Sequence, residues 1–402
     1  MQDVYIVDGI RTPIGSLGGS LSSVRSDDLA ALVIRSLIER NRNIPTDAID
    51  DVILGCANQA GEDNRNVARM AVLLSGLPFT VPGETVNRLC ASGMSAVIHA
   101  TQAIKVGDGD IFVAGGVENM TRGPWVISKT SKPFGSDAQM FDSSFGWRFV
   151  NSNMQKLYGV DPMGVTAENL AELYKISRED QDSFAYHSQA KAKRAQQRGR
   201  FAEEITGVEI SAKKNEISIF DTDEFVKPET TIERLAQLKP AFKKEGGSVT
   251  AGNSSGLNDG AAAMYLASEV ALKKHNLKPK VKIVSSAVVG VEPRIMGIGP
   301  VQATKKVLDK AGLTLQDIDI IELNEAFAAQ SIACIRSLGL EDTDPRINPN
   351  GGAIALGHPL GMSGTRIIQT AMIELQKQNK KYALATMCIG VGQGYAVILE
   401  RI

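Results

Sequence analysis

The chain has 402 residues, of which 43% are hydrophobic, and a formal net charge of -1. This length is too great for one ordinary core and predicts two or three domains. A charge so close to zero gives no reason to expect nucleic acid or an anionic membrane as a partner, because both favour a strongly basic surface.

No apolar run approaches the roughly 20 residues that cross a bilayer. The chain opens on the strand-like Val4–Val7 rather than on a charged and then apolar leader, so we expect a cytoplasmic protein. The cysteines lack C-x-x-C spacing, which predicts neither a disulfide framework nor a zinc site. They are Cys56, Cys90, Cys334 and Cys388.

Short β-rich runs alternate with amphipathic helical stretches over residues 3–120, which predicts a parallel sheet with crossover helices. In chain order the runs are Val4–Val7, Asp27–Arg40, Asp51–Leu54, Val67–Leu74, Thr85–Arg88, Ala91–Lys105 and Asp110–Ala114. Residues 281–402 repeat the theme with Val281–Val289, Val301–Ala311, Ile318–Leu323, Glu325–Leu338, Gly361–Gln376, Tyr382–Met387 and Tyr395–Glu400.

The two stretches also align locally, which suggests two similar halves whose matching turns meet at one face. The overlays are Ile44–Leu54 on Leu313–Leu323 at an offset of 269, Cys90 on His358 at 268, and Ala114–Gly116 on Cys388–Gly390 at 274.

The residues between the two halves differ from them in composition. Residues 121–245 hold both tryptophans and a charged stretch from Thr166 to about Arg200, which predicts one helix capped at Thr166. The glycines and small polar residues of 246–260 favour close backbone approach to a ligand. We therefore expect one half formed by 1–120 with 246–275, an inserted loop domain at 121–245, and a second half at 276–402.

Two cysteines and one histidine lie among small residues. Cys90, in Asn-Arg-Leu-Cys-Ala-Ser-Gly-Met-Ser, precedes a predicted helix whose positive end favours a thiolate. His358, in Gly-His-Pro-Leu-Gly, is the candidate base for this thiol. Cys388 precedes Ile-Gly-Val-Gly-Gln-Gly and supplies a second thiol that can move protons. Such a set suits acyl transfer, which needs an accessible thiolate and N–H groups that receive charge on oxygen.

Together these motifs resemble those of the thiolases, which make or break a carbon–carbon bond between acyl groups carried on coenzyme A. The resemblance runs nearly end to end. It implies an α/β thiolase fold in which two similar βαβαβ-type halves pack as a layered α-β-α-β-α core with an inserted loop domain.

The resemblance also implies catalytic roles. Cys90 would carry the acyl group, and Cys388 would exchange the proton at C2 of the second acyl-CoA. One oxyanion site would consist of the N–H groups of Cys90 and Gly390, and the other of His358 with a water held by Asn324. From its position after Ile318–Leu323, Asn324 can also be read as an ordinary helix cap.

Coenzyme A is implied as co-substrate, with no permanently bound cofactor. The resemblance points to Ser255, Ala326 and Phe327 along the pantetheine and to Lys227 near the nucleotide. A basic cluster is read either as a phosphate attractor or as a solvated helix face; it comprises Lys191, Lys193, Arg194, Arg198 and Arg200. The family forms homodimers and homotetramers, and the aromatic-rich insert could supply part of that contact.

The substrate is indicated by one departure from many short-chain thiolases, which carry a histidine where this chain has Pro162, before Met163-Gly164. This change leaves room for a longer acyl group. The segments at 61–70, 146–150 and 290–300 resemble those of the 3-oxoadipyl-CoA thiolases of aromatic-acid breakdown. Arg148 or Arg65 would then meet the substrate's terminal carboxylate. The alternatives are acetoacetyl-CoA and a broad range of 3-ketoacyl-CoA substrates.

Two other functions fit the sequence less well. A decarboxylating ketoacyl synthase shares the fold but typically uses a Cys-His-His set, whereas this chain has Asn324 and a second thiol. A silent acyl-CoA or lipid carrier would have no need to keep these catalytic side chains.

Overall fold

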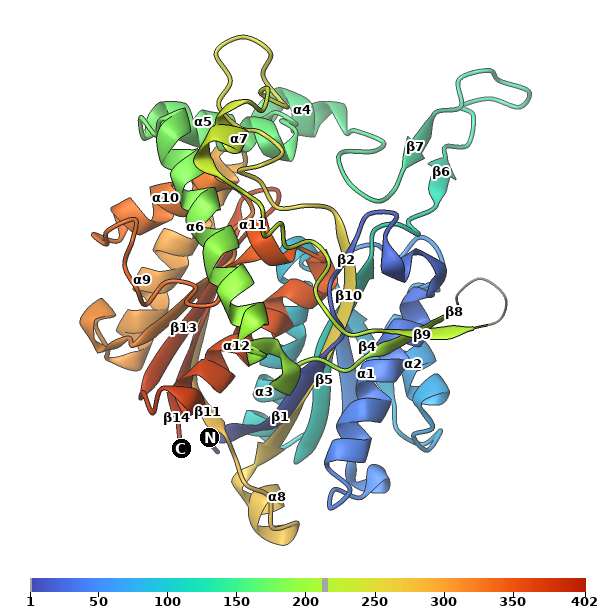
Figure 1. Ribbon diagram of the computed structural model, residues 1–402. Helices are drawn as coiled ribbons and strands as arrows, with labels where there is room; N and C mark the ends of the chain where they lie inside the picture. Colours follow the sequence, from blue (N-terminus) through green and yellow to red (C-terminus); the bar gives the residue numbers. More distant parts are fainter. Residues whose placement is uncertain (1, 212–215) are drawn as a thin grey trace.

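Ten strands pair into a mixed sheet in the computed structural model, which describes residues 2–211 and 216–402 (Figure 1). The N-terminal half has the order β4-β3-β5-β10-β1, with the short β2 (Gly15–Ser16) paired to β10. These strands span Gly83–Val86, Asp51–Gly55, Ile111–Asn119, Asn258–Ser268 and Val4–Arg11. Strand β3 is parallel to β4 and β5, but β10 is antiparallel to β5 and β1.

The C-terminal half repeats this order as β12-β13-β14-β11. The strands span Ile320–Leu323, Tyr382–Ile389, Gln393–Arg401 and Val281–Gly290. A single bridge between Ile321 and Ile347 takes the place of β4. Strand β11 pairs with β1 through Tyr5 and Ile6, which joins the halves into one sheet.

The prediction of a parallel sheet is therefore only partly correct, because parallel pairs are confined to β3 with its neighbours and to β12 with β13. Strands β13 and β14 are joined by a three-residue turn, which permits only antiparallel pairing.

The strand register also corrects one of the predicted overlays. Asp51 pairs with Phe112 as Ile320 pairs with Ala383, so Phe112 corresponds to Ala383 at an offset of 271. The overlay of Ala114–Gly116 on Cys388–Gly390 at 274 is wrong by three residues.

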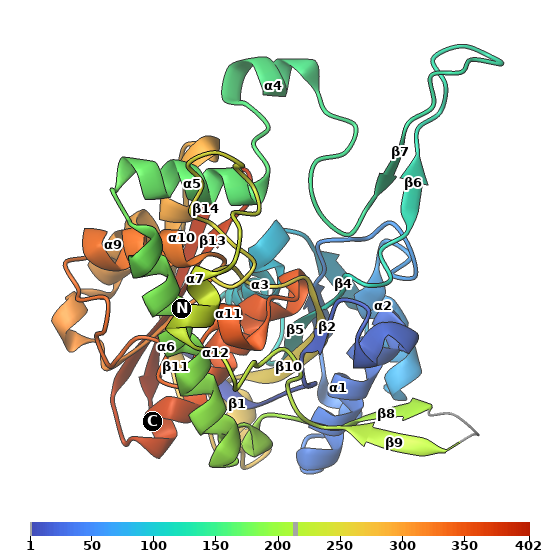
Figure 2. The same cartoon turned by 45° about the horizontal axis from the view of Figure 1, so that its top comes forward.

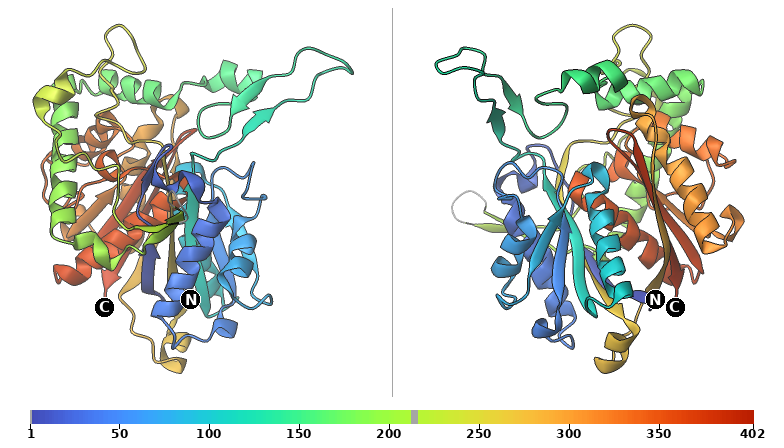
Figure 3. Two further views of the ribbon diagram at one scale, coloured as in Figure 1. Left: turned by 45° about the vertical axis from the view of Figure 1, so that its right-hand side comes forward. Right: turned by 180° about the vertical axis from the view of Figure 1, so that it is seen from behind.

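Helices α3 (Ser92–Val106) and α12 (Leu360–Lys377) pack against each other between the two halves (Figures 1 and 3). One buried apolar cluster takes side chains from both helices and from both halves of the sheet. Helices α1 (Ser26–Arg40) and α2 (Val67–Ser75) cover the outer face of the first half. Helices α9 (Gly299–Ala311) and α10 (Ala328–Ser337) cover that of the second. The predicted five layers are confirmed.

The inserted segment crosses the top of Figure 1 and then returns along one side. Its helices are α4 (Ser152–Tyr158), α5 (Met163–Leu173), α6 (Arg178–Gln197) and α7 (Ile232–Ala236). Its hairpins pair β6 (Trp125–Ile127) with β7 (Met140–Asp142) and β8 (Val208–Ser211) with β9 (Ile217–Phe220). The β6–β7 hairpin stands away from the body of the molecule (Figure 2). Short helices α8 (Glu269–Lys274) and α11 (Ala353–Leu356) lie in the two halves.

The predicted single helix from Thr166 to Arg200 is wrong, because Lys175 has a left-handed φ of 53° that separates α5 from α6. Thr166 lies within α5, where its hydroxyl donates to the Met163 carbonyl at 2.7 Å. Ser177 begins α6 instead, in a capping box with Asp180.

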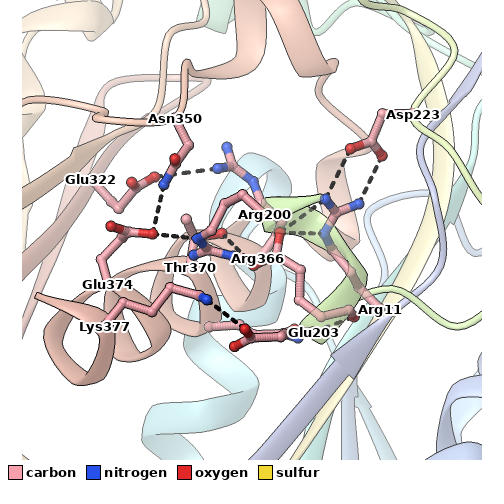
Figure 4. Close-up of polar contacts among 12 residues, drawn as sticks. Arg11, Arg200, Glu203, Asp223, Glu322, Asn350, Arg366, Thr370, Glu374 and Lys377 are labelled. Atoms are coloured by element: carbon pink, nitrogen blue, oxygen red, sulfur yellow. Dashed lines mark hydrogen bonds and ion pairs between the residues drawn. The ribbon is translucent and has the colours of Figure 1, made fainter. Parts of the chain in front are cut away.

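A buried ionic network ties the insert to both halves (Figure 4). Arg11 of β1 pairs with Asp223 at 2.7 Å and with Glu204 at 2.9 Å. Glu204 and Arg200 form a second pair at 3.2 Å, and Arg200 also meets Glu374 of α12. The insert is therefore fixed by charge pairing as well as by apolar packing.

Part of the same network reaches the second half, where Arg366 of α12 pairs with Glu322 of β12 at 3.3 Å. Burial raises the pKa of Glu322 to about 8, although the charge of Arg366 acts in the opposite direction.

In the described part of the chain, none of the helices is both long and apolar enough to cross a membrane.

Candidate active site

The first turns of α3 and α12 meet the ends of β3 and β5 through bare backbone. A Cβ on Gly93 or Gly116 would overlap the carbonyl of Gly361, and one on Gly361 would overlap the carbonyl of Val117. Glycine is required at these positions because any side chain would separate the two helices from the strands. The contact brings the Cys90 turn and the His358 turn to the same edge of the sheet.

Cys90 lies in the 3-10 turn Leu89–Ala91, directly ahead of α3. Its predecessor Leu89 has a left-handed φ of 47°, an unfavourable conformation that turns the chain sharply at this point. Burial raises the pKa of the Cys90 thiol, against the opposing effect of the N–H groups of Gly390 and of Cys90 itself. The thiolate predicted from the helix end is thus disfavoured by burial, and the thiol needs a base.

Cys388 is the next-to-last residue of β13 and is buried. Burial, together with the charge of the nearby Cys90, raises its pKa well above the ordinary value. Its side chain belongs to an apolar cluster with Ala326 and Phe327, against which Met163 packs. Cys388 therefore carries a proton at neutral pH in a site from which water is largely excluded.

His358 lies between α11 and α12 and is held on two sides. Its backbone N–H donates to Asn258 Oδ1 at 2.9 Å, and its Nδ1 lies 2.7 Å from Ser363 Oγ. The Ser363 hydroxyl donates its own proton to the Pro359 carbonyl at 2.8 Å, so it accepts from Nδ1–H. This arrangement leaves the lone pair on Nε2.

The same imidazole is neutral, since burial and the charge of Arg366 lower its pKa to about 3. A neutral imidazole with a free Nε2 can accept a proton from a thiol.

Asn324 is fully buried, and its Nδ2 lies 3.4 Å from His358 Nε2. It is not a helix cap, because α10 begins four residues later with Phe327 at the N-cap position. Its Oδ1 has no hydrogen-bond partner within residues 2–211 and 216–402. A buried carbonyl oxygen of this kind calls for a donor from a water or a ligand.

Three of the residues predicted to contact coenzyme A lie together. The N–H of Ser255 donates to the Ala326 carbonyl at 3.0 Å, and Phe327 bridges to Ser254. Because Ala326 and Phe327 also contact the Cys388 cluster, this segment leads directly to the second thiol.

Lys227 is exposed and borders a separate groove of about 510 Å³. Ala251 and Gly252 line the same groove. Along the chain, the groove lining therefore comes within three residues of Ser255. The side chains of the predicted basic cluster do not share one environment. Arg200 is buried in the ionic network, and Lys191 donates to the Ile347 carbonyl at 2.8 Å. It is not a uniformly solvated face.

The residues singled out for substrate choice lie in three separate segments of the chain. Pro162 is the N-cap of α5, next to Met163. Arg148 donates to the Ser143 carbonyl at 2.9 Å, and Asn58 donates to the same oxygen at 3.2 Å. Arg65 is exposed in the loop between β3 and α2, with a left-handed φ of 64°.

The sequence reading did not assign three polar residues that contact these turns, namely Glu118, Asn258 and Ser363. Ser363 follows the Gly-His-Pro-Leu-Gly motif by two residues, so its spacing from His358 could have identified it. Glu118 and Asn258 are far from the His358 turn in the sequence, and only the fold brings them into contact with it.

Comparison with known proteins identifies the class. Residues 4–270 match the family model described as "Thiolase, N-terminal domain", and residues 277–401 match "Thiolase, C-terminal domain". The chain therefore belongs to the thiolase family and is an acyltransferase.

Its relatives include a 3-oxoadipyl-CoA/3-oxo-5,6-dehydrosuberyl-CoA thiolase of Escherichia coli (strain K12), 58% identical over the full length of both chains. A beta-ketoadipyl-CoA thiolase of Pseudomonas aeruginosa is 55% identical, also over the full length of both. The solved human mitochondrial 3-ketoacyl-CoA thiolase in complex with CoA has a TM-score of 0.92 and 40% identity, covering 100% of this chain and 98% of that one.

Proposed function

We propose that this thiolase cleaves 3-oxoadipyl-CoA with CoA to release acetyl-CoA, and catalyses the reverse Claisen condensation. The full-length likeness to proteins named for this substrate supports the choice. Acetoacetyl-CoA and other 3-ketoacyl-CoA thioesters are the alternative substrates.

In the proposed cleavage, His358 Nε2 takes the proton of Cys90 and the thiolate attacks the 3-keto carbon. The N–H groups of Gly390 and Cys90, already directed at the sulfur, support one oxyanion site. The C2–C3 bond breaks, and Cys388 delivers its proton to C2 of the departing acetyl-CoA. A CoA thiol, deprotonated with help from Cys388 and His358, then takes the acyl group from Cys90.

The second oxyanion site combines His358 with a water on Asn324. The unsatisfied Oδ1 of Asn324 and the 3.4 Å approach of its Nδ2 to Nε2 are the observations in its favour. We assign Ser255, Ala326 and Phe327 to the pantetheine and Lys227 to the nucleotide end, where its groove offers space.

Two variants distinguish the roles of the thiols of Cys90 and Cys388. Cys90→Ser should abolish the acetyl-enzyme seen by mass spectrometry after mixing with acetyl-CoA, because a hydroxyl is far less acidic than a thiol. Cys388→Ala should keep slow acetylation of Cys90 and lose condensation. Equal loss of both steps in Cys388→Ala would contradict the division of roles.

The substrate is tested by kcat/KM for 3-oxoadipyl-CoA and acetoacetyl-CoA. We expect the dicarboxylic substrate to be preferred. A charge-assisted hydrogen bond is worth roughly 1.5–3 kcal/mol, so Arg148→Gln or Arg65→Gln should lower its rate selectively by about 10–150-fold. Preference for acetoacetyl-CoA would refute the substrate and leave the thiolase class intact.

We further propose that residues 1–120 with 246–275, 121–245 and 276–402 are three domains, that the protein acts in the cytoplasm, and that it forms a homodimer or homotetramer. The pairing of β10 with β1 and β5 supports the first division. Exposed apolar side chains on the projecting β6–β7 hairpin support self-association; they include Trp125, Ile127, Phe134 and Met140.

A further inference from the structure

Glu118 is a buried carboxylate that the proposed reaction does not use. It lies near the end of β5 and is 2% exposed. Its Oε2 accepts from the N–H of Gly361 at 2.8 Å and of Ala57 at 2.9 Å, while Oε1 accepts from Asn58 at 3.0 Å. The carboxylate therefore joins β5 to two other backbone segments, residues 57–58 and the start of α12.

We propose that Glu118 is a positioning residue that holds the His358 turn in line with the Cys90 turn. The inference rests on the proposed roles of these two catalytic side chains.

On the His358 side the connection is direct. Gly361 is the second residue of α12 and follows His358 by three residues. Its contact with Val117 and Gly116 is between bare backbones, which allows close approach but provides no side chain to fix the helix. The bond from Gly361 N–H to Glu118 supplies that restraint.

On the Cys90 side the connection runs through Asn87. The Ala57 carbonyl accepts from Asn87 Nδ2 at 2.9 Å, and Asn87 Oδ1 accepts from the N–H of Leu89 at 2.9 Å. Leu89 precedes Cys90 and holds the left-handed conformation of this turn. A continuous chain of hydrogen bonds thus links the two catalytic turns through Glu118.

Electrostatics alone would give Glu118 the opposite effect. Burial raises its pKa to about 7, and its charge contributes to the raised pKa of Cys90. If Glu118 acted only through charge, removing the charge would favour the thiolate and speed acylation. A positioning role predicts slower acylation, so one variant distinguishes the two.

Glu118→Gln keeps the size of the side chain but turns one acceptor into an NH₂ group, which must face at least one of the three N–H donors. We expect kcat and the single-turnover rate of Cys90 acetylation to fall at least tenfold, with KM for the acyl-CoA changed less than twofold. Small misplacement of reacting groups costs rate rather than ground-state binding.

Asp50→Asn is the matched control. Asp50 Oδ2 accepts from the N–H groups of Asp110 and Ile111 at 2.6 and 2.9 Å, at the opposite ends of β3 and β5. This variant loses an exposed carboxylate that likewise accepts from backbone N–H groups beside the same pair of strands, and it should keep the kcat of the parent.

Asn87→Ala breaks the hydrogen-bond chain at an exposed residue, so it tests the proposal even if Glu118→Gln fails to fold. It should show the same fall in kcat at unchanged KM. The positioning role is overturned if Glu118→Gln, or Asn87→Ala in its place, acetylates Cys90 as fast as the parent or faster. The positioning role is also overturned if Asp50→Asn lowers kcat as much as Glu118→Gln does. A parent that forms no acetyl-Cys90 would refute the proposed function itself.

Discussion

Hydrogen bonds to the His358 ring fix what this side chain can do. Ser363 Oγ accepts a hydrogen bond from Nδ1–H, which leaves the lone pair of Nε2 directed toward Asn324. Burial keeps the ring neutral. At the scale of single residues, the ring is therefore neutral before substrate arrives and presents its Nε2 lone pair to the proton of Cys90, although burial lowers the basicity of the ring and raises the pKa of the thiol.

Ser363→Ala should lower kcat/KM at least tenfold, because the imidazole loses the partner that fixes its tautomer and a buried N–H is left unsatisfied. Steady-state thiolysis measures this. Ser331→Ala is the control, since Ser331 is equally buried and its hydroxyl has no partner within the described residues. Similar losses in both variants would point to a general packing effect.

The neutral His358 also affects stability in acid. Its folded pKa of about 3 lies below the unfolded value of 6.5, so the unfolded chain takes up a proton first and acid favours unfolding. Between pH 6.5 and 5.5 this should cost the parent about 1.0 kcal/mol that a His358→Gln variant does not lose. Urea denaturation of both proteins at these two pH values tests it; a constant difference in unfolding free energy would contradict it.

At the scale of elements, the sequence indicates the catalytic turns well because each is marked by glycines and one reactive side chain. Strand β10 was missed: its Asn-Asp-Gly-Ala-Ala-Ala start has little β propensity, and burial between β1 and β5 determines its conformation instead. The break between α5 and α6 depends on one left-handed residue, Lys175, which no helix-breaking Gly or Pro signals. Glu118 could not be assigned, because its partners lie in segments brought together only by the fold.

Breaking the ionic network should destabilise the protein strongly. Arg200→Met leaves Glu204 and Glu374 buried without this partner, a loss of about 3–5 kcal/mol in unfolding free energy. Lys273→Ala, which removes an exposed pair with Glu269, should cost far less. Chemical denaturation measures the free energy of unfolding of both variants. Equal losses would show that the buried pairs contribute no more than surface pairs.

At the scale of the whole molecule, the β6–β7 hairpin projects from the rest of the chain (Figure 2). Its exposed apolar side chains are costly for an isolated subunit in water. The proposed self-association would bury them, and it would do so at a distance from the helices α3 and α12 that follow the Cys90 and His358 turns.

Trp125→Glu combined with Ile127→Glu should lower the particle mass measured by light scattering, for example from tetramer to dimer. Val270→Glu, an equally apolar exposed position on α8 at the opposite end of Figure 1, should leave the mass unchanged. An unaltered mass in the hairpin variant would rule out the hairpin as the contact.

The position of β1 in the middle of the sheet has a consequence for synthesis of the chain. β1 leaves the ribosome well before its two neighbours, β10 and β11, which begin only at Asn258 and Val281. Until then both of its edges lack partners, and such edges invite aggregation. Contacts between distant parts of a chain also slow folding. We therefore expect chains arrested before residue 258 to expose β1 to protease, and β1 to become protected only after β10 has emerged.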